Sequence, residues 1–215
     1  MIHGISLGRY AGVFPQDVEV HDGNRAAWEL LLRLQEGESI RLLLHGPPGR
    51  GKTHMMAATL NEIERKWPMG TYVYWTMTRF VVARRMAMSG AYDDPVELCI
   101  RAHVVFLDDL GAERQTEWGI AGLYDILEER ARKRKPIVVA TNCSLEDLEQ
   151  FYGARTLHRL LGVDARIVRV DGPDRRFEQA RGEVTIAKRW TDAFGPHESG
   201  CYADYPAGSL GRGDG

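Results

Sequence analysis

The sequence predicts an α/β fold with a buried parallel sheet, and three stretches indicate it. Apolar runs at 40–45, 103–107 and 137–140 have the length and composition of strands that are buried on both faces. Segments with helix-compatible spacing separate these runs. Glycine-rich or polar residues follow each run, at the strand ends where open parallel sheets bind ligands.

The first run leads into a phosphate-binding loop. The chain reads G-x-x-x-x-G-K-T from Gly46 to Thr53, between a predicted strand and a predicted helix. Lys52 adds positive charge near the β- and γ-phosphates, and the Thr53 hydroxyl is suited to ligate Mg²⁺. A glycine-rich turn that fits by chance is the weaker alternative, because the strand and helix context is present as well. The predicted nucleotide-binding residues are Gly46, Pro47, Pro48, Gly49, Arg50, Gly51, Lys52, Thr53 and His54.

The second run ends in two carboxylates, Asp108 and Asp109. At the carboxyl end of a buried strand, we expect both beside the phosphate loop. Asp108 is the first acid after the run and suits the Mg²⁺ shell, whereas Asp109 suits polarising an attacking water. A pair of turn or helix-cap aspartates explains an isolated strand end more often, but the phosphate loop in the same chain favours the catalytic interpretation.

Three more polar residues are catalytic candidates. Asn142 follows the third run, where it can orient the lytic water or sense the γ-phosphate; a turn asparagine is the alternative. Arg155 and Arg159 are four residues apart, so a helix places them on one face. Such a pair can reach a γ-phosphate in its own subunit or in a neighbour, and a solvated helix face is an equally weighted alternative.

Two basic segments bear on nucleic acid. The predicted helix at 79–88 carries arginines that can contact a phosphate backbone, although a solvated face explains them as well. The cluster at 130–135 ends a predicted helix at 116–135, and we favour its interaction with the helix dipole over DNA binding. The DNA-binding candidates are therefore Arg79, Arg84 and Arg85.

The remaining chain divides into an arm, a domain and an extension. Residues 1–21 show no sustained periodicity and are predicted to be an N-terminal arm that approaches the nucleotide base. Residues 22–176 form the predicted domain. Residues 177–215 are a polar extension, whose last 15 or so residues are expected to be disordered. The other predicted elements are helices at 22–37, 52–67 and 144–152, strands at 72–77 and 166–170, and a loop at 92–95.

Composition narrows the class of protein. The 215 residues are 44% hydrophobic and 27% charged, as in an ordinary globular domain, and the formal net charge is −2. DNA contact would therefore need a local patch or several subunits around a pore. Three widely spaced cysteines argue against a zinc site and a disulfide framework. No apolar run approaches about 18 residues and no leader pattern is present, so we expect a cytoplasmic protein without a membrane partner.

Several motifs together resemble a known family. These are G-P-P-G-R-G-K-T-H at 46–54, L-D-D-L-G at 107–111, A-T-N at 140–142 and G-P-D-R-R at 172–176. They resemble the AAA+ ATPases, and more narrowly the bacterial and phage replicative helicase loaders of the DnaC/DnaI type and the related IstB transposition ATPases. The resemblance covers about residues 26–176. The phosphate loop alone is common to many nucleotide-binding proteins, and His54 and the D-D-L-G sequence narrow the group to these families.

The resemblance implies a P-loop AAA+ three-layer sandwich around a five-stranded parallel sheet, with little or no C-terminal helical lid. It further implies ATP and Mg²⁺ at the strand ends and self-association into an open spiral or ring. Asn142 would be the sensor residue, and Arg159 the arginine finger with Arg155 as a second candidate in trans. The helix at 79–88 would line single-stranded DNA. Asp109 stands where the AAA+ motif usually has Glu, as in the loader-like subgroup.

The leading functional hypothesis is an ATP-dependent loader, which uses ATP hydrolysis and single-stranded DNA to load a ring-shaped replicative helicase of the DnaB type. A second hypothesis is an IstB-like transposase helper that acts on duplex DNA. A third is a nucleotide-gated adaptor with little turnover, for which Asp109 in the Glu position counts. A small-molecule kinase is disfavoured, because no arginine-rich lid motif is found.

Overall fold

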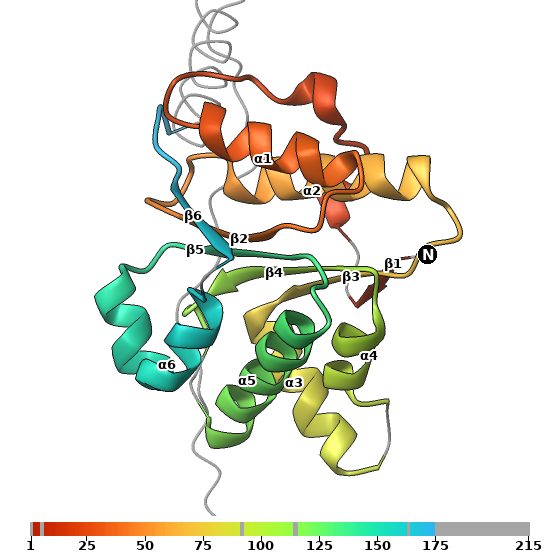
Figure 1. The fold of residues 1–215 in the computed structure, drawn as a ribbon, viewed down its shortest axis with the longest axis vertical. Coiled ribbons are helices and arrows are strands. Elements are labelled where there is room, and N and C mark those ends of the chain that lie inside the picture. The colour runs from red at the N-terminus through yellow and green to blue at the C-terminus, as the bar shows by residue number, and fades with distance from the viewer. Residues whose placement is uncertain (1, 5–6, 91–92, 114–115, 163, 175–215) are drawn as a thin grey trace, which may run out of the picture. The chain divides into compact units, whose positions relative to one another are not determined.

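A sheet of six parallel strands lies at the centre of the fold (Figure 1). The computed structural model describes residues 2–4, 7–90, 93–113, 116–162 and 164–174, which all belong to one unit, Met1–Arg175. The strand order is β1-β3-β4-β5-β2-β6. The strands are β1 (Ile2–Gly4), β2 (Arg41–His45), β3 (Tyr72–Thr76), β4 (Val104–Leu110), β5 (Ile137–Thr141) and β6 (Ala165–Arg169). The five predicted strands are confirmed, and β1 adds a sixth at one edge.

Helices cover both faces of this sheet (Figure 1). Along β2, Leu42 and Leu44 point into one buried cluster and Leu43 into the other, as the two-residue period of a strand requires. The first cluster contains α1 and α2, and the second contains the remaining helices. The three-layer sandwich is therefore confirmed. The helices are α1 (Arg25–Gln35), α2 (Lys52–Lys66), α3 (Met77–Met88), α4 (Pro95–Arg101), α5 (Glu117–Arg132) and α6 (Leu145–Leu160).

The N-terminal segment packs onto the domain. β1 pairs with β3, and two short 3-10 helices follow at Gly8–Tyr10 and Pro15–Asp17. Leu7 and Val18 are buried in the α1–α2 cluster. The Asn61 side-chain amide of α2 donates hydrogen bonds to the Tyr10 and Val13 carbonyls at 2.9 and 2.7 Å. Three residues of strand show no periodicity, which is why the sequence did not reveal β1.

Helix α4 is absent from the sequence-based prediction, which has a loop at 92–95 and no helix after it. Its start nevertheless follows ordinary helix chemistry. The Asp94 carboxylate accepts the Val96 N–H at 3.0 Å, and Pro95 occupies the first turn, where its missing N–H costs nothing. With seven residues, α4 is too short for its apolar spacing to stand out.

Helix α6 is interrupted at Gly153, as the sequence predicts. Its first half begins with a capping box, in which the Asp147 N–H donates to Ser144 Oγ at 3.1 Å. Gly153 has φ 77° and ψ 154°, a conformation that is essentially confined to glycine. The chain then resumes the helix, so the second half has its own direction and carries Arg155 and Arg159.

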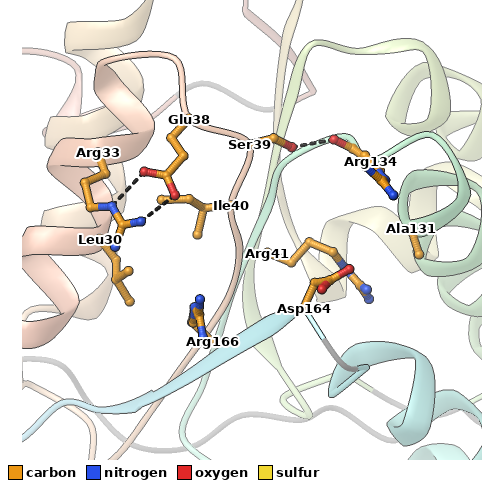
Figure 2. Close-up of a pocket in the computed structure, with 10 residues that line it drawn as sticks. All are labelled: Leu30, Arg33, Glu38, Ser39, Ile40, Arg41, Ala131, Arg134, Asp164 and Arg166. Atoms are coloured by element: carbon orange, nitrogen blue, oxygen red, sulfur yellow. Dashed lines mark hydrogen bonds and ion pairs between the residues drawn. The ribbon is translucent and has the colours of Figure 1, made fainter.

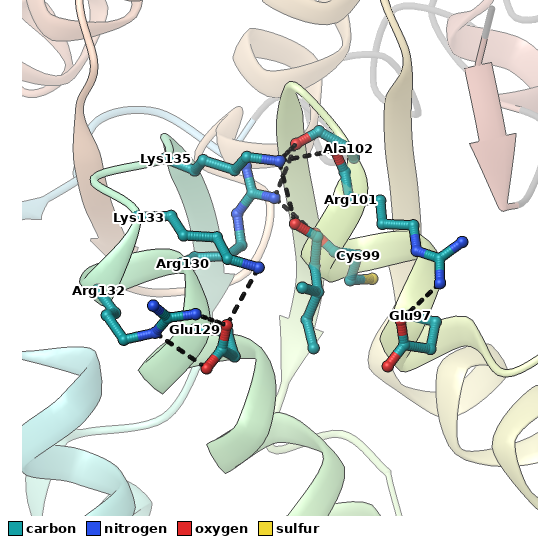
Figure 3. A network of polar contacts seen from close by, with 10 residues as sticks. Glu97, Cys99, Arg101, Ala102, Glu129, Arg130, Arg132, Lys133 and Lys135 are labelled. Carbon is teal, nitrogen blue, oxygen red and sulfur yellow. Dashed lines mark hydrogen bonds and ion pairs between the residues drawn. The ribbon is translucent and has the colours of Figure 1, made fainter.

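Arg130 joins three segments at the edge where the strands begin, which we call the amino edge (Figure 3). The side chain is fully buried, whereas the sequence analysis groups it with a basic cluster at a helix end. Its guanidinium donates to the backbone carbonyls of Cys99, Ala102, His103 and Pro136. Burial lowers the pKa of Arg130 to about 10. Arg130 therefore has a structural role that neither predicted interpretation includes.

The neighbouring cations of this cluster have ordinary partners (Figure 3). Lys135 Nζ donates to the carbonyls of Ile100, Arg101 and Ala102, at the end of α4. Arg132 and Lys133 pair with Glu129 within α5 and the turn that follows it. Charge at a helix C-terminus is thus used locally, on backbone carbonyls and a nearby acid.

Two predictions lie outside the described residues. These are the C-terminal extension at 177–215 and the absence of a helical lid after residue 174. Among the helices that the structure describes, none is long and apolar enough to cross a membrane.

Candidate nucleotide-binding site

The predicted phosphate loop, the two acids and Asn142 follow the strands β2, β4 and β5 at one edge of the sheet, which we call the carboxyl edge. β5 lies between β4 and β2, and all three strands run parallel. The phosphate loop after β2, the acids of β4 and Asn142 after β5 therefore come together. This is the position that open parallel sheets offer to ligands.

The phosphate loop follows β2 and ends at Gly51, the N-cap of α2. A side chain at Gly46 would collide with the Val170 carbonyl, and one at Gly49 would collide with the Asp174 carboxylate. The segment after β6 therefore lies against the loop. Gly46 is required because the Val170 backbone approaches it closely, whereas Gly49 is favoured by its positive φ of 80° and by the Asp174 side chain against it.

Lys52 is buried within this loop and is only 6% exposed. Its Nζ donates hydrogen bonds to the Gly46 and Pro47 carbonyls at 2.6 and 2.8 Å. The ammonium group is therefore held at the start of the loop, next to the N-terminus of α2. Loop N–H groups, a helix N-terminus and a lysine together favour an anionic ligand.

The local charge at the end of β2 is positive. His45 is the last residue of that strand and pairs in register with Arg169 of β6. The pKa of His45 is lowered, first by burial and then by the positive charges of Arg169 and Lys52. The lowered pKa favours neutral His45, so the positive charge at this strand end comes from Arg169 and Lys52.

Asp108 is the most buried acid of the site, with 2% exposure. The Tyr74 hydroxyl donates to Asp108 Oδ2 at 2.8 Å, and the Asp109 N–H donates to Oδ1 at 2.9 Å. The Thr53 hydroxyl is a further hydrogen-bond partner. Burial raises the pKa of Asp108, and the negative charge of Asp109 raises it further. A buried carboxyl group with a raised pKa in a ligand-binding position is typical of a functional site.

The contact between Thr53 and Asp108 fits a magnesium ion. Mg²⁺ prefers oxygen ligands and commonly takes one or two from the protein, with phosphate oxygens and waters completing its shell. A hydroxyl and a carboxylate side by side meet this requirement. Among the described residues no cluster of three or more His, Cys, Asp or Glu side chains is arranged for a metal. The role of Thr53 and Asp108 as magnesium ligands stays a prediction, in which phosphate oxygens complete the shell.

The structure changes the setting of Asp109. The sequence predicts both acids at the end of the strand, but β4 continues to Leu110. Its register with β5 shifts between Leu107 and Leu110, so Asp109 lies in a bulge with φ 55°. Aspartate tolerates this left-handed conformation better than most residues. The bulge breaks the alternation of the strand and leaves Asp109 partly exposed at the carboxyl edge.

Asn142 directly follows Thr141, the last residue of β5, and is exposed. Thr141 Oγ1 donates to the Leu110 carbonyl at 2.6 Å and accepts the Cys143 N–H at 3.0 Å. These bonds fix the turn that carries Asn142 to the end of β4. The structure therefore brings Asn142 to the acids, while its role as a sensor stays a prediction.

Arg155 and Arg159 make their contacts with α5. The Arg155 guanidinium lies over the Tyr124 ring, 4.5 Å from its centroid. Arg159 forms an ion pair with Glu128. A hydrogen bond to Tyr124 and the charge of Glu128 raise the pKa of Arg159. None of these contacts reaches the phosphate loop. The sequence allows either arginine to act on the nucleotide of its own subunit or of a neighbour, and the structure gives no support to the first of these.

The three arginines of α3 differ from one another. Arg79 and Arg85 are exposed. Arg84 instead binds both carboxylate oxygens of Asp94 at 2.9 Å and donates to the Trp118 carbonyl at 3.1 Å. Its side chain is 16% exposed. Arg84 therefore connects α3 to α4 and α5, and the DNA-binding prediction now rests on Arg79 and Arg85.

A basic pocket of about 390 Å³ lies at the amino edge, away from the phosphate loop (Figure 2). Arg33 and Glu38 form a two-bond pair inside it, at 2.7 and 2.5 Å. Arg41 begins β2 and donates to the Arg159 carbonyl. The pocket is lined by Leu30, Arg33, Glu38, Ser39, Ile40, Arg41, Ala131, Arg134, Asp164 and Arg166. It neighbours the end of α6 and is separate from the nucleotide site.

His54 connects the loop helix to the N-terminal segment. Its Nε2 lies 3.1 Å from the Asp17 carbonyl, and its ring meets the Tyr10 ring edge-on. The N-terminal segment is thus fixed on α2 directly behind the phosphate loop. That this segment contacts the nucleotide base stays a prediction.

Two buried residues of the site have no place in the sequence analysis. Tyr74 binds Asp108, and Glu113 binds the backbone of the turn after β4. Tyr74 looks like any aromatic residue of a buried strand. Its hydroxyl reaches Asp108 only because β3 pairs with β4 in a register that sets Thr76 beside Asp108.

The arrangement of loop, lysine and acids is that of a nucleotide-binding domain, and a family comparison decides which kind. The model of the IstB-like ATP-binding proteins matches residues 35–181, which include the phosphate loop, both acids and Asn142. The chain belongs to this family. ATP binding is therefore the family property that the phosphate loop serves.

Relatives of this family member include proteins of replication and transposition. It is 29% identical over 183 residues to the replicative helicase loader DnaI of Bacillus subtilis, covering 75% of this chain and 57% of the relative. It is 28% identical over 167 residues to an ATP-binding protein in an insertion sequence of Mycobacterium tuberculosis, covering 71% and 61%. The chain thus spans about three fifths of each relative's length.

The fold of this family member agrees with solved AAA+ structures. The replication initiator DnaA bound to AMPPCP and single-stranded DNA superimposes with a TM-score of 0.67 at 19% identity, covering 82% of this chain and 55% of that one. At this identity the likeness concerns the fold. The predicted AAA+ architecture and the predicted relationship to helicase loaders and IstB-type ATPases are confirmed.

Proposed function

We propose that this protein is an ATPase that loads a ring-shaped replicative helicase of the DnaB type. The observation that carries the proposal is the contact of the Thr53 hydroxyl with the Asp108 carboxyl, beside a phosphate loop that buries Lys52. This is the arrangement that ATP hydrolysis needs. The similarity to the loader DnaI supports the choice of helicase loading.

ATP binds across the carboxyl edge of the sheet. Loop N–H groups and Lys52 hold the β- and γ-phosphates. Thr53 and Asp108 would hold Mg²⁺, which would supply positive charge against the phosphates. Burial and the negative charge of Asp109 raise the pKa of Asp108, and a bound cation would favour its carboxylate form.

Hydrolysis uses the partly exposed acid of the bulge. Asp109 accepts a hydrogen bond from water and polarises it for attack on the γ-phosphorus, with ADP as the leaving group. Asn142 orients this water from the adjacent strand end. Arg159, with Arg155 beside it, stabilises the developing charge on the nucleotide of a neighbouring subunit, as an arginine finger does.

Nucleotide state controls assembly and DNA binding. Because an arginine of one subunit contacts the γ-phosphate of the next, ATP favours a spiral or ring of subunits and hydrolysis releases them. The exposed Arg79 and Arg85 of α3 contact single-stranded DNA in this assembly. Several subunits together supply the positive charge that a single chain of net charge −2 lacks.

The experiment is a loading assay with purified helicase rings, closed circular single-stranded DNA and ATP. We expect the wild type to promote helicase loading and Lys52→Ala to be inactive because it does not bind ATP. Arg159→Ala should bind ATP normally without hydrolysing it. Arg132→Ala is the matched control, since Arg132 forms an exposed ion pair within α5 and should behave as wild type. Normal hydrolysis by Arg159→Ala would show that the finger assignment is wrong.

A transposase helper is the second candidate, favoured by the IstB-like family and the insertion-sequence relative. It predicts preference for duplex over single-stranded DNA, measured by fluorescence anisotropy with ATP. A nucleotide-gated adaptor is the third, favoured by Asp109 in the position where Glu is usual. It predicts tight ATP binding without phosphate release. Failure to bind any helicase, together with duplex preference, would replace the loader proposal by the second.

A further inference from the structure

A buried acid outside the proposed catalytic set bridges two functional segments. Glu113 lies in the turn after β4 and is 6% exposed. Its Oε2 accepts the Gly111 N–H at 3.0 Å, and its Oε1 accepts the hydroxyl of Tyr152 from α6. Both carboxyl oxygens are therefore used, one on each segment.

The first segment is the turn that begins at Asp109. The Ala112 N–H donates to the Asp109 carbonyl at 3.0 Å and closes the turn. Asp108 holds its start through the Asp109 N–H, and Thr141 holds its middle through the Leu110 carbonyl. Glu113 adds an attachment at the Gly111 N–H and links it to Tyr152 of α6. A left-handed aspartate keeps its direction only where such surrounding bonds fix it.

The second segment is the break in α6. Tyr152 is 6% exposed and directly precedes Gly153, where the helix changes direction. Arg155 and Arg159 lie beyond this break. Glu113 thus holds α6 directly before the break that separates its arginine-bearing half.

We propose that Glu113 is a positioning residue for ATP hydrolysis, which fixes the Asp109 turn to Tyr152 so that the water-activating carboxylate and the arginine-bearing half of α6 are held as one unit. The proposal rests on the proposed function of Asp109 and Arg159. Small displacements of catalytic groups cost large factors in rate, so loss of this bridge should slow the chemical step. ATP binding should be unaffected, because Glu113 contacts neither the phosphate loop nor Thr53 in any described hydrogen bond.

The test compares Tyr152→Phe, Glu113→Gln and the double variant with the wild type. Tyr152→Phe removes only the bridging hydroxyl, and we expect kcat to fall about tenfold with the Kd for ATP unchanged. Because both residues act through one bond, the double variant should lose no more than the worse single variant. Tyr72→Phe is the matched control: it deletes another buried hydroxyl, which donates to the Trp67 carbonyl at the amino edge, and kcat should stay at the wild-type value.

A second readout separates this proposal from the proposed function. Amide hydrogen exchange at Gly111 should be faster in Tyr152→Phe than in the wild type, whether or not the protein hydrolyses ATP. If the wild type releases no phosphate, the proposed function is wrong. The exchange rate at Gly111 then still tests whether Glu113 connects the Asp109 turn to Tyr152. Unchanged exchange at Gly111 overturns the proposal. So does unchanged kcat, or a fall in kcat accompanied by equal loss of ATP affinity and thermal stability.

Discussion

Two buried cations lie at opposite edges of the same sheet, and both donate hydrogen bonds to backbone carbonyls. Lys52 binds two carbonyls of its own loop at the carboxyl edge. Arg130 binds four carbonyls at the amino edge, from the end of α4 and the segments before β4 and β5. Arg130 thus joins separate parts of the chain, whereas the two carbonyls that Lys52 binds both belong to its own loop.

The residues that surround Lys52 also differ from those that surround Arg130. Beside Lys52 lie glycines with positive φ and an acid whose pKa is raised by burial and repulsion. Such features lower stability and persist where function needs them. Near Arg130 the turn after α5 also has one residue of positive φ, Arg134 with φ 50°, but no carboxylic acid with a raised pKa lies beside it among the described residues. A buried cation or a strained residue alone therefore does not identify an active site, whereas a buried carboxylic acid with a raised pKa beside a phosphate loop does.

The largest effect that we expect is on stability, from Arg130→Met. Methionine fills the space but removes the guanidinium from four carbonyls, of which that of Ala102 keeps its bond from Lys135, and the free energy of unfolding should fall by about 3 kcal/mol. Urea denaturation measures it. Arg132→Met is the matched control, because its guanidinium is exposed and pairs only with Glu129; it should change stability by less than about 0.5 kcal/mol. Equal effects of both variants would contradict the structural role of Arg130.

Lys52→Ala should have the opposite profile. Its ATP affinity should fall by at least about 100-fold, or roughly 3 kcal/mol, because the charge that faces the phosphates is lost. Its unfolding free energy should stay within about 1 kcal/mol of the wild type, since the two hydrogen bonds to Gly46 and Pro47 lie within one loop. Calorimetric titration with ATP, combined with denaturation of the same preparations, measures both quantities. A Lys52→Ala variant that loses several kcal/mol of stability yet binds ATP like the wild type would contradict this prediction.

The sequence predicts the carboxyl edge better than the amino edge. Nucleotide chemistry demands particular residues at fixed spacing, so Lys52, Thr53 and Asp108 are recognisable from their order along the chain. Arg130 serves carbonyls from distant segments, and any surface arginine would look the same in the sequence. Its role depends on packing between α4 and α5, which local patterns do not report.

The acids of the site also divide into two that the sequence predicts and one that it does not. Asp108 and Asp109 follow an apolar run and are predicted. Glu113 comes four residues after Asp109 and looks like an exposed turn residue until Tyr152 is brought to it by the fold. The bulge at Asp109 is likewise a property of the β4–β5 pairing, which one strand's sequence does not contain.

A smaller gain in stability should follow from Asp108→Asn. Because the folded state raises the pKa of Asp108, it binds the proton more tightly than the unfolded chain, and ionisation therefore destabilises the nucleotide-free protein. The variant should be about 1 kcal/mol more stable at neutral pH. This advantage should shrink as the pH falls towards the ordinary aspartate pKa of about 4, where wild-type Asp108 is protonated. Thermal unfolding between pH 4 and 7.5 measures the difference in stability between the variant and the wild type. A difference that does not change with pH would contradict the raised pKa of Asp108.

Lys135→Ala should give the smallest effect. Lys135 Nζ adds a partly exposed positive charge to carbonyls at the end of α4, one of which, that of Ala102, also accepts from Arg130. We expect a loss of about 0.5–1 kcal/mol in unfolding free energy and no change in ATP affinity. A loss as large as that of Arg130→Met would mean that the lysine, and not the buried arginine, joins the segments.

The central claim is that the strained carboxyl edge hydrolyses ATP, and phosphate release by Asp109→Asn tests it most directly. Asparagine tolerates the left-handed backbone at this position, so the bulge should persist. With ATP and Mg²⁺, we predict steady phosphate release by the wild type and at least a 100-fold slower rate in the variant, at equal ATP affinity. Wild-type turnover by Asp109→Asn would contradict the account.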